Sequence, residues 1–337
     1  MLTLVPEIGI DLGTANILVY LKGKGIVLRE PSVVAVNVNT KKLVAIGEEA
    51  KAMLGRTPTG IAVVKPMSDG VIADYTVTTM LLEHIVAKVC GRRRMMKPTI
   101  IIAVPSEVTQ VEKRAVIHAA KNAGAKFAYT IDEPWAAAIG AGMSISSPRG
   151  NMVVDMGGGT TDIAVLSLNG IVTSKSVRIA GNKFDEIIGR YIKNNYSLMI
   201  GDMTAEEIKV TIGSAYPDND KKTMKVGGRD LIEGLPKTVE VTSGEIREAL
   251  KESLKTITEG IRTVLESTPP ELSADIIESG IMLTGGSSML EGLDKLIAEE
   301  TGVKVIKAED PLSAVALGCG GALDMMDKLR DTVLSTY

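Results

Sequence analysis

Cysteine is scarce in this chain. The two cysteines, Cys90 and Cys319, lie far apart and form no CxxC pair. This spacing argues against a zinc site and against a disulfide framework, and it favours a reducing compartment. We therefore expect both cysteines to be ordinary core residues and the protein to be cytoplasmic.

Aromatic residues, excess charge and long apolar runs are scarce as well. Aromatics make up 3% of the 337 residues and the net charge is −3, which argues against a nucleic-acid partner because base-stacking platforms and a basic surface are both lacking. We find no apolar run of 18 residues and no signal-peptide pattern in residues 1–5. With 45% hydrophobic and 23% charged residues, the chain has an ordinary globular composition and the length for two domains.

The chain does contain a glycine-rich hairpin, NMVVDMGGGTTDIAVLSLNGIVTS, at residues 151–174. A short apolar strand ends at Asp155, and a second strand follows the turn. Glycines lack a Cβ, so their N–H groups can converge on an anion such as phosphate. Asp155 is placed to hold Mg²⁺ through water, because this ion usually keeps several waters. A flexible glycine-rich loop without a ligand is the alternative interpretation. The turn residues with this potential are Gly157, Gly158, Gly159, Thr160 and Thr161.

A second copy of this unit lies near the N-terminus. Residues 8–27 read IGIDLGTANILVYLKGKGIV, with Asp11, Gly13 and Thr14 in the places of the later acid, glycines and threonines. The two units are about 145 residues apart, which is too far for a solenoid and indicates two related halves. Each half then supplies one phosphate-facing turn and one carboxylate to a shared cleft.

Strands and helices alternate through both halves, which favours an α/β fold with a mostly parallel, helix-covered sheet in each half. In the first half we predict strands at 26–38, 99–104 and 126–131, and helices at 74–90 and 108–123, the latter capped by Ser106. In the second half we predict helices at 182–196 and 204–212, and a long helix that is capped by Ser243 and ended by Pro269 and Pro270.

Five separated motifs occur together in one order. They are DLGTAN at 11–16, DEP at 132–134, DMGGGTTD at 155–162, TAEEIK at 204–209 and LTGGSS at 283–288. Together they resemble the actin-like ATPase superfamily. With DGVIAD at 69–74 and TPPEL at 268–272, the chain resembles MreB-type bacterial actins over nearly its whole length.

This resemblance implies the actin-like ATPase fold, in which two duplicated ribonuclease-H-like domains with mixed sheets flank a nucleotide cleft. The implied first half is 1–142 plus a C-terminal helix at 312–337, with a small insertion at about 31–65. The implied second half is 143–311, with an insertion at about 182–242.

The resemblance also implies roles for individual residues. Those expected to hold the β- and γ-phosphates of ATP are Gly13, Thr14, Ala15, Asn16, Gly157, Gly158, Gly159, Thr160 and Thr161. Asp11 and Asp155 are expected to flank hydrated Mg²⁺. Glu133 is expected to orient the attacking water, with Asp155 and Thr161 beside it in the catalytic set. From spacing alone, Glu133 is equally well a helix N-terminal acid stabilised by the helix dipole.

The nucleoside end of the implied site comes from the second half. Residues expected to contact the adenosine are Gly181, Asp185, Glu206, Lys209, Gly285, Gly286 and Ser287. Without the resemblance, Glu206 and Lys209 are an ordinary surface ion pair. The chain has Asp132, Asp162 and Ser287 where MreB-type sequences usually have Glu, Glu and Gly. The serine puts a Cβ where backbone is expected to approach the nucleotide.

A basic loop stands between a predicted helix and a predicted strand. It consists of Arg92, Arg93, Arg94, Met95 and Met96, followed by Lys97. Cations near a helix C-terminus are often just solvated. The resemblance favours instead a loop that inserts methionines among lipids while arginines meet anionic headgroups, at about 1 kcal/mol per basic residue.

The function implied by the resemblance is that of an ATP-hydrolysing bacterial actin. Such a protein forms head-to-tail, membrane-associated filaments at the inner face of the cell membrane and organises cell-wall synthesis and rod shape together with cell-envelope proteins. The alternatives are a non-polymerising chaperone-type ATPase and a small-molecule kinase of the same superfamily.

Overall fold

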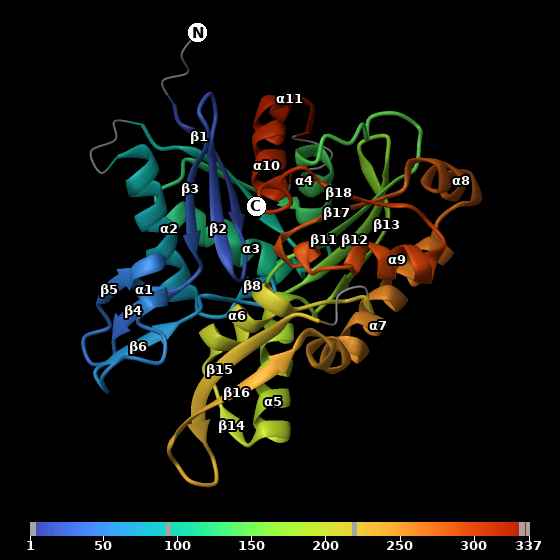
Figure 1. Ribbon diagram of the computed structural model, residues 1–337. Coiled ribbons are helices and arrows are strands. Elements are labelled where there is room, and N and C mark those ends of the chain that lie inside the picture. The colour runs from blue at the N-terminus through green and yellow to red at the C-terminus, as the bar shows by residue number, and fades with distance from the viewer. Residues whose placement is uncertain (1–4, 92–95, 218–220, 330–333, 335–337) are drawn as a thin grey trace.

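The computed structural model describes residues 5–91, 96–217, 221–329 and 334. Two five-stranded sheets, built on the same plan, make up its centre (Figure 1). The first has the order β10-β9-β1-β2-β3 and the second the order β13-β12-β11-β17-β18. The first sheet contains β1 (Glu7–Leu12), β2 (Asn16–Leu21), β3 (Gly25–Pro31), β9 (Thr99–Val104) and β10 (Phe127–Asp132). The second contains β11 (Asn151–Met156), β12 (Thr161–Ser167), β13 (Gly170–Val177), β17 (Ile281–Thr284) and β18 (Val305–Lys307).

Both sheets are mixed, as the resemblance implies, and the expectation of mostly parallel sheets is wrong. In each sheet the three hairpin strands pair antiparallel. Of the two later strands, β9 and β17 pair parallel with the first strand of their sheet, and β10 and β18 pair parallel with β9 and β17. The reason is that each half begins with two tight turns, which can join only antiparallel strands. The repeat in the sequence is therefore a repeat of the whole sheet.

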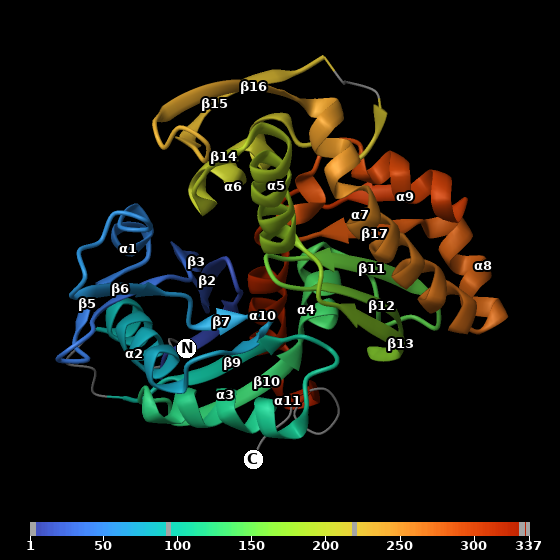
Figure 2. The same cartoon turned by 90° about the horizontal axis from the view of Figure 1, so that it is seen from below.

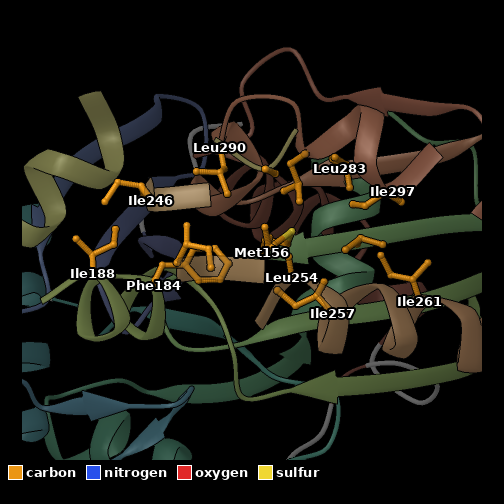
Figure 3. Close-up of a cluster of buried hydrophobic side chains, with 14 of the residues drawn as sticks. Met156, Phe184, Ile188, Ile246, Leu254, Ile257, Ile261, Leu283, Leu290 and Ile297 are labelled. Atoms are coloured by element: carbon orange, nitrogen blue, oxygen red, sulfur yellow. The ribbon is translucent and has the colours of Figure 1, made fainter. Parts of the chain in front are cut away.

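Helices cover the outer face of each sheet. On the first sheet these are α2 (Tyr75–Cys90) and α3 (Gln110–Asn122), which bury Leu81, Ile85 and Ile117 against Ile100 and Ile102 of β9. On the second sheet α7 (Ser243–Ser267) and α9 (Leu293–Thr301) cover the outer face, while α8 (Pro270–Ser279) packs near β11. Met156, at the end of β11, belongs to this second core together with Phe184 and Leu283 (Figure 3).

The inner faces of the two sheets share a third core around α4 (Glu133–Gly140) and α10 (Ala314–Asp324). Because neighbouring residues of a strand point to opposite faces, Ile101 and Ala103 of β9 contact this core while Ile100 and Ile102 face outward. Figure 2 shows α4 and α10 between the two sheets. The C-terminal helices therefore return to the centre of the molecule, where α11 (Met326–Leu329) follows α10.

A small sheet extends from each half. The first consists of β4 (Val34–Asn37), β5 (Leu43–Ile46) and β6 (Ile61–Val64), with α1 (Glu48–Ala52) between β5 and β6. The ribbon of β7 (Met67–Ser68) and β8 (Val71–Ile72) follows in the chain. The second consists of β14 (Leu198–Met199), β15 (Thr223–Asp230) and β16 (Pro236–Thr242), next to α5 (Gly181–Tyr196) and α6 (Asp202–Ile212).

Three expected boundaries are wrong. Residues 26–38 do not stay in one sheet: β3 ends at Pro31, which has no N–H to extend the ladder, and Val34 pairs with Val64 in the small sheet. The cap of α3 is Thr109, which forms a capping box with Glu112. The cap of α7 is Thr242, one residue before Ser243.

Two glycines allow α4 and α10 to touch backbone to backbone. A Cβ on Gly140 would lie 1.7 Å from the Ala314 carbonyl oxygen, and one on Gly318 would lie 1.8 Å from the Ala136 carbonyl oxygen. No real Cβ can come so close, so both positions require glycine. Within the described ranges, no helix combines the length and apolarity needed to cross a membrane.

We predict that Gly318→Ala lowers the free energy of unfolding by about 2–3 kcal/mol or more, because α4 and α10 must separate to admit the methyl group. Gly189→Ala is the matched control, since Gly189 is also inside a helix and a Cβ there meets nothing within 4 Å. That change should stabilise by about 0.5–1 kcal/mol. Urea unfolding of both variants checks this; equal midpoints would contradict the close packing.

Candidate functional site

A cavity of about 500 Å³ lies between the two halves, within the range of small-molecule sites. Its wall consists of residues from both hairpin turns, from the helices α4, α5 and α6, and from the turn after β17. The predicted site residues on its wall are Asp11, Gly13, Thr14, Ala15, Asn16, Glu133, Asp155, Gly157, Gly158, Gly159, Thr160, Gly181, Asp185, Glu206, Lys209, Gly285, Gly286 and Ser287. Residues predicted from widely separated motifs thus meet in one place.

Thr161 is the exception. It is fully buried and does not line the cavity, and its hydroxyl donates to the Ile179 carbonyl at 2.7 Å. The alternation of side chains along β12 turns Thr161 away when its neighbour Thr160 faces the cavity. The structure therefore places the Thr161 hydroxyl away from the cavity wall, and the place of Thr161 in the catalytic set stays a prediction.

The two hairpin turns are in contact across the cavity. A Cβ on Gly158 would lie 2.5 Å from the Ala15 Cβ, and one on Gly159 would lie 2.6 Å from the Thr14 hydroxyl. Glycine at these positions is therefore needed both for the approach of the turns and for exposed backbone N–H groups. The two halves present their turns to the same space.

Gly70 is a wall residue that the sequence analysis does not assign. Its N–H donates to the Thr14 hydroxyl at 3.1 Å, and its φ of 75° lies in the left-handed region that favours glycine. A Cβ there would also lie 2.4 Å from the Pro105 ring. The Asp69-Gly70 pair in DGVIAD is a turn signature that could have located it.

Three carboxylates face the cavity without a basic partner in the described part of the chain. Burial raises the pKa of Asp11 to about 8, and the charge of Asp155 adds to the effect. Burial also raises the pKa of Asp155 to about 7, although the Thr284 hydroxyl donates to its carboxylate at 2.8 Å. Burial raises the pKa of Glu133 well above its usual range, with Asp162, Asp11 and Asp155 contributing.

This donor set fits a hydrated divalent cation. A bound cation favours the ionised carboxylates that burial and mutual repulsion disfavour. Among the described residues, no group of three or more His, Cys, Asp or Glu side chains is arranged to hold a metal ion. A cation beside Asp11 and Asp155 would therefore keep water in its coordination shell, as Mg²⁺ prefers.

The two acidic departures from the family pattern have defined partners. Asp162 lies opposite Asp155 in the strand register, and its carboxylate accepts from the N–H and hydroxyl of Ser106 at 3.1 and 3.2 Å. Asp132 pairs with Lys113 of α3 at 2.8 Å and is not among the wall residues. Both acids thus support the site from outside the cavity.

At the other end of the cavity, α5 begins without a side-chain cap, and the N–H groups of Gly181 and Asn182 donate instead to the carbonyls of Gly157 and Gly158. Lys209 pairs with Asp185 at 2.8 Å and donates to the Gly181 carbonyl at 3.0 Å. Glu206 pairs with Lys51 of α1 at 2.9 Å. The interpretation of Glu206 and Lys209 as a pair with each other is therefore wrong.

Apolar side chains also line this end of the cavity, and the sequence analysis misses them because isolated apolar residues carry no motif. They are Phe184, Val210, Met289, Leu290, Leu312 and Val315. Val210 and Met289 are 77% and 59% exposed, as expected of side chains at the open side of a binding site. The arrangement suits a flat apolar group beside a charged tail.

Most of the basic loop lies outside the described residues. Nothing in the structure therefore bears on Arg92, Arg93, Arg94 or Met95. Met96, the first described residue after them, is 42% exposed.

Comparison with known proteins gives one consistent result. The family model for MreB/Mbl protein matches residues 5–331. The cell shape-determining protein Mbl of Bacillus subtilis is 52% identical over 329 residues, which cover 98% of this chain and 99% of that protein. The cell shape-determining protein MreB of Escherichia coli K12 is 51% identical over 326 residues, which cover 95% and 94%.

Solved structures agree with the sequence relatives. The crystal structure of MreB5 of Spiroplasma citri bound to AMPPNP matches with a TM-score of 0.91 and 39% identity, covering 96% of this chain and 97% of that one. The MamK double helical filament matches with a TM-score of 0.80 and 25% identity, covering 96% and 99%. The fold is that of the actin-like ATPases.

We predict that the stability of the protein without nucleotide and with EDTA falls as pH rises from about 4 to about 8. Over this range the unfolded chain ionises Asp11 freely while the folded chain keeps it protonated, because its folded pKa is about 8 against 3.8. Asp11→Asn should reduce the loss of stability with rising pH. Asp202→Asn, at an exposed position of α6, should leave that loss unchanged. If the urea midpoints of wild type and Asp11→Asn change equally between pH 6 and pH 8, the raised pKa of Asp11 is contradicted.

Proposed function

Because this chain belongs to the MreB/Mbl family of cell shape-determining proteins, we propose that it binds and hydrolyses ATP with Mg²⁺ and polymerises in an ATP-dependent manner. The observation that carries this proposal is the meeting, in one cavity, of the two hairpin turns and of three carboxylates without a basic partner among the described residues. One relative with the same fold adds support, since MreB5 of Spiroplasma citri has been solved both with AMPPNP and with ADP.

In this proposal the turn amides of both halves hold the β- and γ-phosphates, and Thr14 and Thr160 add hydroxyl donors. Asp11 and Asp155 would hold Mg²⁺ through water, and a bound ion would supply positive charge next to the phosphates. Asp185, Lys209 and the apolar wall receive the nucleoside. Because phosphoryl transfer depends mainly on positioning and electrostatic stabilisation, the shared cavity supplies most of what the reaction needs.

Glu133 is the proposed catalytic carboxylate. It is the first residue of α4, it is 8% exposed and it lies on the cavity wall. Its raised pKa, caused by burial and by neighbouring carboxylates, suits a group that orients the attacking water and accepts its proton. The same position gives the carboxylate a favourable interaction with the helix dipole, so the structural and catalytic roles are compatible.

We assign residues 1–142 and 312–337 to one half and residues 143–311 to the other, with inserted subdomains at about 31–65 and 182–242. The packing of α10 against β1 supports placing the C-terminal helix with the first half. The cavity then lies between two bodies, and the phosphate groups contact turns from both. Nucleotide binding thereby draws the halves together.

We propose further that the protein forms head-to-tail filaments at the inner face of the membrane, with cell-envelope partners in cell-wall synthesis. The double helical filament formed by MamK, which has the same fold, supports self-association. The membrane proposal rests on the sequence of residues 92–96 and on the exposure of Met96. A chaperone-type ATPase and a small-molecule kinase are less well supported, because the curated relatives that match nearly the whole chain are cell shape-determining proteins.

We predict that Glu133→Ala lowers ATP turnover at least about 100-fold, as expected on loss of a group that positions water and accepts a proton. Affinity for ATP should change little, because the turns that hold the phosphates are untouched. Phosphate release and nucleotide binding should be measured with Glu252→Gln, an exposed position of α7, as the control. Unchanged turnover in Glu133→Ala would remove this residue from the mechanism.

We predict that the protein pellets with ATP and Mg²⁺ but not with EDTA, and co-sediments with vesicles that contain anionic lipid. Replacing Arg92, Arg93 and Arg94 by Ser should weaken vesicle binding about 100-fold, at about 1 kcal/mol per arginine. Pelleting without vesicles should be unaffected. The control is to replace Lys41 and Lys42, which are exposed between β4 and β5, by Ser. Equal losses of vesicle binding would indicate a general charge effect and would contradict the loop assignment.

A further inference from the structure

Ser287 links the two turns of the second half. It lies in the 3₁₀ segment η2 (Gly286–Met289), directly after β17 and Gly285. Its hydroxyl donates to the Gly157 carbonyl at 2.6 Å. The side chain that departs from the family pattern is thus bonded to the first glycine of the phosphate-facing turn.

The same region of the turn is held from a second side. The Gly157 carbonyl also accepts the N–H of Gly181 at 3.3 Å, and the Gly158 carbonyl accepts the N–H of Asn182 at 2.8 Å. Ser287 and the start of α5 therefore fix two consecutive carbonyls. These carbonyls point toward α5 and η2.

Fixing a carbonyl also fixes the next N–H, because the two groups of a planar trans peptide point in opposite directions. The described chain contains no cis peptide. The N–H groups of Gly158 and Gly159 are therefore directed away from Ser287 and α5, and both residues lie on the cavity wall. Within the described chain, neither N–H donates to another backbone group.

We propose that Ser287 is a positioning residue, whose hydroxyl holds the Gly157–Gly158 peptide with its N–H toward the polyphosphate of the bound nucleotide. This inference rests on the proposed function, and it extends that function to a residue that the family pattern leaves without a side chain. Ser287 acts indirectly, by orienting the turn. The amide N–H groups of the turn then point toward the bound anion, as they do in other anion-binding backbone concavities.

The surroundings of the hydroxyl support this orientation. Its oxygen lies 2.8 Å from the position that a Cβ on Gly181 would take, and Lys209 Nζ lies 3.3 Å from the same point. Ser287 therefore fills the space where a side chain at position 181 would lie, and Lys209 donates to the Gly181 carbonyl at 3.0 Å. A larger residue at 181 would displace the hydroxyl from Gly157.

Ser287→Ala and a matched neighbour test the proposal. Ser288 also donates its hydroxyl at 2.6 Å, but to the Gly285 carbonyl of its own turn, and it is not among the wall residues. Affinities for ATP, ADP and AMP should be measured with Mg²⁺ for wild type, Ser287→Ala and Ser288→Ala. Thermal unfolding of each nucleotide-free variant reports its folding separately.

We expect Ser287→Ala to lose affinity for ATP and ADP several-fold, up to about tenfold, the usual value of one hydrogen bond. Affinity for AMP should stay within twofold, since AMP lacks the β- and γ-phosphates that these amides face. The KM for ATP should rise while kcat changes little. Ser287→Thr, which retains a hydroxyl, should regain most of the affinity, and Ser288→Ala should match wild type in all three affinities.

Two results would overturn the inference but leave the proposed function standing. An equal loss of affinity for AMP in Ser287→Ala would indicate that Ser287 contacts the nucleoside directly. Unchanged affinities for all three nucleotides would indicate that its hydrogen bond is purely structural. If wild type binds none of the three nucleotides, the proposed function fails and the inference fails with it. The wild-type titration therefore distinguishes the two failures.

Discussion

The backbone contact between α4 and α10 is the constraint on which the site depends. Gly140 and Gly318 let these helices approach until no side chain fits between them. The inner faces of both sheets pack on this pair of helices, so the distance between the sheets is fixed there. That distance places the turn after β1 against the turn after β11, and it carries Glu133, at the start of α4, to the cavity.

The cavity concentrates acidic groups at some cost to stability. Burial and mutual repulsion disfavour the charged forms of Asp11, Asp155 and Glu133. Sites of this kind are common where binding and catalysis require charge in a confined space. In the proposed function, the cation and the turn amides complement these charges, so ligand binding and folding stability are coupled.

Much of the architecture could be predicted from the sequence because the information is local. The repeated strand, acid, glycine and threonine pattern predicts both hairpins, and the five motifs predict which residues share one cavity. The roles of these residues in binding stay predictions. The alternation of strands and helices predicts mostly parallel strand pairing, which is wrong because the two tight turns that begin each half join antiparallel strands.

The remainder depends on contacts between distant residues. Thr161 carries the same side chain as Thr160, and only the strand register decides that it bonds Ile179 instead of facing the cavity. The sequence pattern predicts Ser106 as a helix cap, but its hydroxyl donates to the carboxylate of Asp162, more than fifty residues away. From the sequence, the Cβ of Ser287 is expected where backbone approaches the nucleotide; in the structure, the Ser287 hydroxyl donates to the Gly157 carbonyl.

The ion pair of Lys51 and Glu206 also cannot be predicted from the local sequence pattern. It joins α1 to α6 beside the cavity, and both side chains are partly exposed. Polar contacts of this kind are screened by dissolved ions, so higher ionic strength should weaken the contact between α1 and α6. The packing of α4 against α10 at the base of the cavity consists of apolar side chains and close-packed backbone, which ionic strength leaves intact.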